Sequence, residues 1–212
     1  MKTDELIRAI AQDSRTRRTS LRGRIAVALV AGGLSALLLY AFTLGPRPDL
    51  AHALQSWRFV FKLAFVFIAF WTAASACSRL TRPDAGFQDV QLRLSIVPLV
   101  LFAGITAELA SVSAATWHER MVGTNASTCL VSIPSLSAAS LVALLVSLRD
   151  EAPGSPAASG AAAGLLAATL SAAIYATHCP DDSPLFVAVW YSTAIGIVTL
   201  LGAMLGRKFL KW

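Results

Sequence analysis

The sequence predicts an all-α membrane protein, a polytopic bundle of six transmembrane helices with both termini in the cytoplasm. Of its 212 residues, 56% are apolar and 14% are charged, whereas soluble proteins average about half and a quarter. The mean hydropathy is +0.63, so the apolar residues exceed what a core of this size can hide from water, and the excess must face lipid. This composition argues against a soluble enzyme, a disordered chain, a disulfide-dense secreted module and a nucleic-acid-binding protein.

Six apolar segments are long enough to cross a bilayer, which takes roughly 20 residues of helix. They are residues 25–44, 59–77, 94–112, 129–148, 157–177 and 185–205. The connections between them are short, which favours antiparallel neighbours. We therefore divide the chain into three parts, a cytoplasmic segment (1–24), a membrane domain (25–206) and a cytoplasmic tail (207–212).

Formal charge enters these segments at two positions, Lys62 and Glu108. Each lies near the end of its segment, from which a long side chain can reach the interface, so we expect both to snorkel towards water.

Small residues predict close packing of the last two helices. Gly160 and Gly164 lie near one end of the fifth segment, and Gly202 and Gly206 near the opposite end of the sixth. In an antiparallel hairpin both pairs come to the same depth, where a small-xxx-small face lets two backbones approach closely.

The distribution of basic residues gives the orientation. Fourteen of the 18 lysines and arginines lie in the first 24 residues, the second and fourth connections and the C-terminal end. The remaining four are Arg47, Arg58, Lys62 and Arg120. Under the positive-inside rule, the side with fourteen basic residues is the cytoplasmic one. We expect the chain in a bacterial inner membrane. Its net charge of +6 then follows from the excess of basic residues on the cytoplasmic side.

The first 24 residues are too few to fold alone. Residues 3–13 have the pattern of an amphipathic helix, with Leu6, Ile7 and Ile10 on one face and Arg8 beside them, which suits docking in the groove of a partner. The arginine-rich residues 14–24 that follow are typical of an anchor to anionic membrane lipid, and an acidic protein is the alternative partner. The connection 78–93 is the other sizeable surface on this side.

The topology separates the three cysteines. Cys129 and Cys179 lie on the outer side, and Cys77 lies on the inner side, about 30 Å away by bilayer thickness. A disulfide needs Cα atoms within about 7 Å, so only the two outer cysteines can pair.

Several hypotheses are open for the role of the outer cysteines. Cys129, Cys179 and His178 are candidate ligands for a transient heavy-metal ion, and a reversible disulfide is equally reasonable in an oxidising compartment. A purely structural reading is also open, because buried cysteines are common at helix ends. Residues 180–184 in any case predict a tight turn, in which Ser183 caps the sixth helix and Pro184 takes its first position.

The six apolar segments lack the sequence patterns that are typical of enzymes or transporters. Neither an HExxH pattern nor a nucleotide-binding loop occurs, and the segments have no paired acids or broken helices of the kind that transporters show. We therefore assign no catalytic residue and no resident cofactor, and expect a protein that is not an enzyme.

Two stretches resemble the NrsF family, whose name stands for negative regulator of sigma F. They are the opening MKTDELIRA at residues 1–9 and the longer THCPDDSPLFVAVWY at residues 177–191, and the six-segment layout is similar over essentially the whole chain. The resemblance implies an inner-membrane anti-sigma factor that holds a sigma factor of the extracytoplasmic-function type and does not contact nucleic acid directly. It also implies that Cys129 and Cys179 sense metal or oxidative stress, and it assigns no role to Cys77.

Under this reading Leu6, Ile7, Arg8 and Ile10 are the expected contacts for the sigma factor. Two other classes of function stay open at this point. One is a small transporter or channel for a metal or an oxyanion. The other is a thiol oxidoreductase linked to a quinone, against which the absence of a CxxC motif argues.

Overall fold

The structure, a computed structural model, describes residues 20–80, 87–150 and 153–210. Its elements are α2 (Leu21–Thr43), α3 (Leu50–Ala53), α4 (Trp57–Leu80), α5 (Phe87–Leu94), α6 (Ile96–Ser111), the 3-10 turn η1 (Ala114–Thr116), α7 (Trp117–Val122), α8 (Ala126–Leu148), α9 (Pro156–Ala176), α10 (Pro184–Phe186), the π-helical turn η2 (Val187–Tyr191) and α11 (Ser192–Phe209). No strand occurs among these residues, so the predicted all-α class is confirmed for the described chain.

Within the described residues, six helical stretches are long and apolar enough to cross a membrane. They are Leu21–Thr43, Trp57–Leu80, Gln88–Ser111, Ala114–Leu148, Pro156–Ala176 and Pro184–Phe209. Each overlaps one predicted segment, so the number and order of the helices long and apolar enough to cross a membrane are confirmed. The third and fourth are longer than expected, because α5 precedes α6 and α7 precedes α8.

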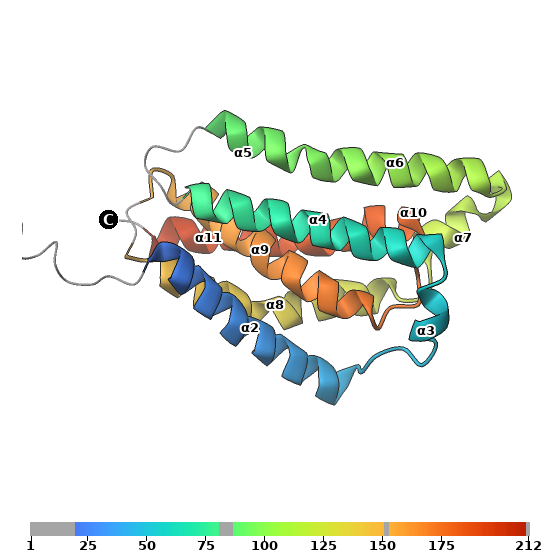
Figure 1. The fold of residues 1–212 in the computed structure, drawn as a ribbon, viewed down its shortest axis with the longest axis horizontal. Helices are drawn as coiled ribbons and strands as arrows, with labels where there is room; N and C mark the ends of the chain where they lie inside the picture. The colour runs from blue at the N-terminus through green and yellow to red at the C-terminus, as the bar shows by residue number, and fades with distance from the viewer. Residues whose placement is uncertain (1–19, 81–86, 151–152, 211–212) are drawn as a thin grey trace, which may run out of the picture.

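The six spans run back and forth along one long axis (Figure 1). Span α9 lies in the middle of the bundle and packs against α2, α4, α8 and α11. The start of α2 and the end of α11 lie at the same end (Figure 1), as an even number of crossings requires.

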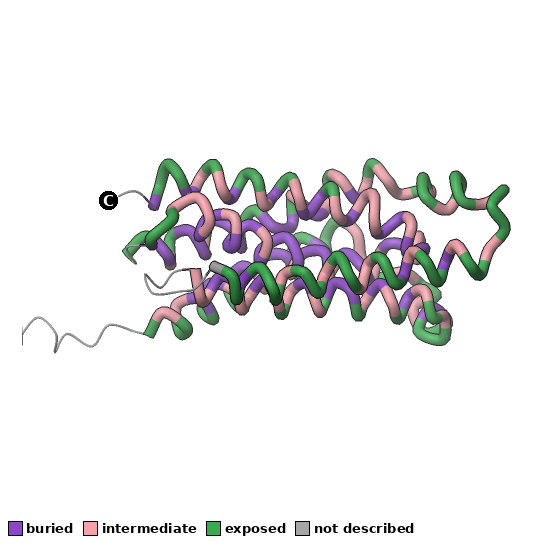
Figure 2. The backbone as a smooth tube through the Cα atoms, turned by 90° about the horizontal axis from the view of Figure 1, so that it is seen from above, coloured by how far each residue is buried: buried purple, intermediate pink, exposed green. Residues whose placement is uncertain are grey.

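The central place of α9 follows from its composition. Alanine, glycine and serine make up most of this helix, and it is the most buried of the six spans. Small side chains let four neighbours approach its axis closely. The buried residues accordingly concentrate along the middle of the bundle, with exposed ones on its outer faces (Figure 2).

Helices α9 and α11 are in backbone contact at the predicted glycines. A methyl group added at Gly160 would meet the Gly202 carbonyl oxygen and would lie 2.7 Å from the Gly206 Cα. One added at Gly164 would lie 2.5 Å from the Val198 carbonyl oxygen. The expected small-xxx-small contact is therefore confirmed.

The outer faces of the spans are apolar. On α2, Val30, Leu34 and Phe42 are 62%, 57% and 86% exposed, and Trp71 on α4 and Leu99 on α6 are exposed in the same way. Large apolar side chains in this number belong in lipid rather than water.

Candidate functional site

Cys129 and Cys179 lie at the end of the bundle opposite α2's first residue, around the turn that joins α9 to α10. We call residues 177–183 the Cys179 turn. Ser183 caps the next helix, its hydroxyl accepting a hydrogen bond from the Leu185 amide at 3.3 Å, and Pro184 occupies the first helical position. The predicted turn and cap are thus confirmed.

The two thiols are buried at the same end of the bundle. Cys179 in the turn and Cys129 in the first turn of α8 are free and both fully buried, and both belong to the buried core. Burial raises the pKa of the Cys179 thiol, and the nearby Lys62 ammonium opposes that rise. Cys179 is therefore protonated at neutral pH, and its reaction requires a proton to leave.

Two tyrosines enclose the thiols on the side of the bundle interior. The rings of Tyr175 and Tyr191 lie 5.9 Å apart, centroid to centroid. Both are fully buried near Cys179, and neither hydroxyl has a hydrogen-bonding partner among the described residues. The thiols thus share a closed, mainly apolar environment.

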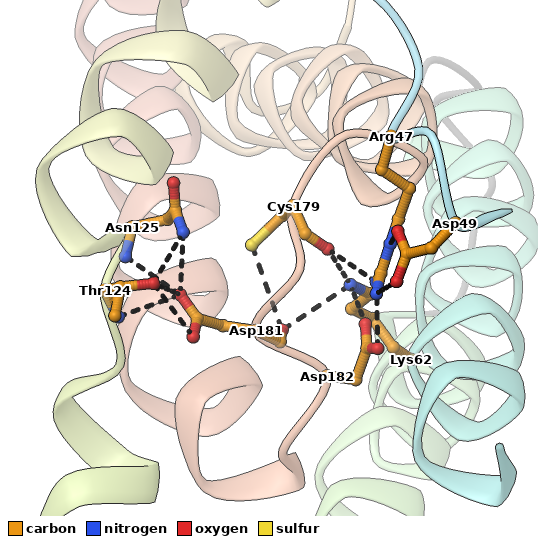
Figure 3. Close-up of polar contacts among 8 residues, drawn as sticks. All are labelled: Arg47, Asp49, Lys62, Thr124, Asn125, Cys179, Asp181 and Asp182. Atoms are coloured by element: carbon orange, nitrogen blue, oxygen red, sulfur yellow. Dashed lines mark hydrogen bonds and ion pairs between the residues drawn. The ribbon is translucent and has the colours of Figure 1, made fainter. Parts of the chain in front are cut away.

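Two cations, the buried Lys62 and the half-buried Arg47, hold the Cys179 turn against α4 (Figure 3). The Lys62 ammonium donates to the Cys179 carbonyl oxygen at 2.7 Å and forms an ion pair with Asp182. The Arg47 guanidinium, from the loop after α2, binds the other oxygen of Asp182 at 2.9 Å. It also binds Asp49, whose pKa it lowers to about 2.

Asp181 ties the same turn to the start of α8. Its carboxylate accepts hydrogen bonds from the backbone amides of Thr124 at 3.0 Å and Asn125 at 2.8 Å, where an anion is favoured by the helix N-terminus. Gly123 makes the approach possible, because its φ of +61° suits glycine and a methyl group there would lie 2.8 Å from the Asp181 Cγ.

A second ion-pair cluster ties the turn to α6. Glu108 is fully buried and binds Arg58 of α4 at 2.8 Å and Arg120 of α7 at 3.1 Å. Ser183, at the end of the Cys179 turn, donates to the same carboxylate at 3.3 Å. The turn therefore contacts α4, α6, α8 and the loop after α2 through polar groups.

The expectation that Lys62 and Glu108 snorkel to water is wrong. Both side chains are 0% exposed, because oppositely charged partners reach them inside the bundle. A buried charge persists only when it is paired and hydrogen bonded, and Asp182 and the arginines Arg58 and Arg120 supply those pairs.

His178 does not face the thiols as a third ligand would. Its Nδ1 lies 2.9 Å from the Gly45 carbonyl oxygen, and its ring packs on Tyr175 at 5.8 Å. Across the three described ranges, no three His, Cys, Asp or Glu side chains are grouped as metal ligands. The structure thus buries Cys129 and Cys179 at the same end of the bundle and directs His178 Nδ1 to the Gly45 carbonyl.

The remaining residues singled out in the sequence lie away from the Cys179 turn or outside the described residues. Cys77 is buried near the far end of α4. Leu6, Ile7, Arg8 and Ile10 lie outside the described residues. The roles of Arg47 and Asp182 in holding the turn were not predicted. Two signals of a buried ion pair were nevertheless present, a lysine inside an apolar segment and a pair of aspartates beside a cysteine.

The chain is similar to known proteins over its full length. The family model described as negative regulator of sigma F, NrsF, matches residues 10–212. The anti-sigma-F factor NrsF of Caulobacter vibrioides is 32% identical over 218 residues, covering 100% of both chains. A protein of Azospira oryzae named "Probable anti-sigma-F factor NrsF" is 32% identical over 213 residues, again covering 100% of both.

No solved structure matches the chain. The family match covers well over half of the residues, and both relatives align from end to end. The chain therefore belongs to the NrsF family of negative regulators of sigma F.

Proposed function

We propose that this protein is an inner-membrane anti-sigma factor that binds a sigma factor of the extracytoplasmic-function type at its cytoplasmic end and releases it when Cys129 and Cys179 react with a metal ion or an oxidant. The end-to-end similarity to two proteins named as anti-sigma-F factors carries the first half of the proposal. The buried thiol pair at one end of the bundle supports the second.

The ion pairs support the proposed orientation. All four basic residues at the thiol end, Arg47, Arg58, Lys62 and Arg120, are bound to buried or half-buried carboxylates. They serve the packing of that end and leave little free positive charge there. The basic residues that follow the positive-inside rule are at the opposite end, which we assign to the cytoplasm.

Reaction of the thiols would alter the Cys179 turn in one of two ways. Disulfide formation removes two protons and two electrons from the pair, and the oxidant accepts them. A soft divalent metal ion instead displaces the two protons and binds both sulfurs. Either product changes the position of Cys179 relative to Cys129, and the Lys62 and Asp181 contacts must readjust.

Helix α6 is the element best placed to carry this change across the membrane. It is the least buried of the six spans, so it can shift with little loss of packing. Its thiol end is fixed to Ser183 of the turn through Glu108. At its other end the preceding helix α5 is held by an exposed Arg79–Asp89 pair at 3.4 Å, which contributes little stability.

Capture of the sigma factor tests the first half of the proposal. The full-length chain in detergent should retain the sigma factor encoded in the same organism, and a variant lacking residues 2–13 should lose it, because that segment carries Leu6, Ile7, Arg8 and Ile10. A shorter truncation at the other end, lacking residues 209–212, is the control and should still bind.

Two results would count against this assignment. Retention of the sigma factor by the variant lacking residues 2–13 would move the contact to residues 78–93. Absence of capture together with metal or oxyanion flux in liposomes would favour a transporter.

A further inference from the structure

A groove lies on the bundle at the end away from the thiols. It has a volume of about 680 Å³ and is bounded by α2, α4 and the junction of α5 and α6. Its walls are mainly apolar, with Ile25 and Leu29 of α2, Trp71 of α4 and Ile96 of α6 among them. Two arginines, Arg22 and Arg93, complete the lining.

The arginines mark the end of the groove that meets the membrane surface. Arg22 lies in the first turn of α2, and Arg93 lies in the last turn of α5, just before α6 begins. Leu29 lies seven residues further along α2, about 10 Å deeper at 1.5 Å per residue. The groove therefore runs from the interface to roughly the middle of one leaflet of a bilayer core about 30 Å thick.

Both arginines are available to an external anion. Each is exposed, and among the described residues Arg22 has no ion-pair partner. Arg93 donates to the Ser75 hydroxyl at 3.4 Å, a long bond to a neutral group that leaves the charge unpaired. The groove thus combines an apolar floor with two arginines at its mouth that have no carboxylate partner among residues 20–80, 87–150 and 153–210.

We propose that this groove binds one anionic phospholipid, with its phosphate between Arg22 and Arg93 and an acyl chain along Ile25, Leu29 and Trp71. Basic pockets between transmembrane helices bind anionic head groups in this way, and guanidinium groups bind phosphate by charge-assisted hydrogen bonds. A protein segment would not match the depth of the groove, since most of its apolar wall lies within the hydrocarbon region. The proposal does not depend on the thiols or on the sigma factor.

Native mass spectrometry of the full-length chain tests the site, with phosphatidylglycerol and phosphatidylcholine of identical acyl chains as probes. We expect the wild type to retain the first phosphatidylglycerol roughly tenfold to thirtyfold more tightly than phosphatidylcholine, the effect of two surface arginines. The double variant Arg22→Gln/Arg93→Gln should lose this preference. The matched variant Arg207→Gln/Lys208→Gln, which removes two charges from the same end on α11, should keep it.

A second variant tests the apolar part of the site without changing charge. Ala74 lines the same groove, and Ala74→Leu should weaken retention of both lipids by filling the floor. An unchanged preference in Arg22→Gln/Arg93→Gln, or an equal loss in the α11 control, would overturn the proposal. So would a requirement for both arginines in capture of the sigma factor in lipid-free detergent, because the groove would then be a protein contact.

Discussion

Replacing Gly202 by valine is expected to lower the free energy of unfolding by about 3 kcal/mol or more, the upper end of what overpacking costs. A methyl group at Gly202 would meet the Gly160 carbonyl oxygen and would lie 2.9 Å from the Gly164 Cα. These are backbone atoms of α9, which no rotamer change can move. The two helices must therefore separate, and α9 is the element against which four other spans pack.

The same helix supplies the control. Gly196 is also on α11, and a methyl group there would meet nothing within 4 Å. Gly196→Val should therefore change stability by less than about 1 kcal/mol. Denaturation of the purified variants in mixed micelles measures both effects. Equal stabilities of the two variants would contradict the backbone contact between α9 and α11.

Replacing Lys62 by methionine is expected to lower the free energy of unfolding by about 3–5 kcal/mol, the cost of removing one partner from a buried ion pair. Lys62 is fully buried, and its ammonium neutralises Asp182 and binds the Cys179 carbonyl oxygen. Methionine fills a similar volume but supplies neither interaction. Arg47 still binds Asp182 at 2.9 Å. We therefore expect the decrease in the free energy of unfolding to lie near the lower limit, about 3 kcal/mol.

A basic residue on the same helix is the matched comparison. The Arg79–Asp89 pair of α4 is exposed, at 40% and 68%, so Arg79→Met should cost no more than about 1 kcal/mol. Adding Asp182→Asn to Lys62→Met should restore part of the lost stability, because it removes a carboxylate that has lost one of its two cationic partners. If Lys62→Met were as stable as the wild type, the ion pair would not hold the turn in place.

The spans were predictable because their physical cause is local. A bilayer requires about 20 apolar residues in a row, and that requirement can be read without knowing what each helix touches. The glycines on α9 and α11 were predictable for a related reason, since the antiparallel hairpin fixes their common depth. The structure confirms both features.

The burial of the Lys62 and Glu108 side chains was not predictable in the same way. Whether a charge near the end of a span reaches water or is buried depends on partners far away in sequence. Lys62 pairs with Asp182, 120 residues further along, and Glu108 is reached by Ser183, 75 residues further along. Only packing of α10 against the neighbouring ends of α4 and α6 brings these groups together.

The thiol site was partly predictable. Topology alone separated Cys129 and Cys179 from Cys77, and the structure indeed buries the first two at the end of the bundle away from Cys77. The direction of the His178 side chain depends on the loop after α2, whose Gly45 carbonyl it contacts. No pattern within residues 177–183 contains that information.

We propose that chemistry at the Cys129 and Cys179 thiols releases a sigma factor from the other end of the bundle. The direct measurement is the fraction of sigma factor that stays bound to the detergent-solubilised full-length chain after addition of Cd²⁺ or, separately, of diamide. We expect the wild type and the matched variant Cys77→Ser to release most of it with at least one reagent, and Cys129→Ser/Cys179→Ser to release none. Complete retention by the wild type with both reagents, or equal release by the double variant, would contradict the claim.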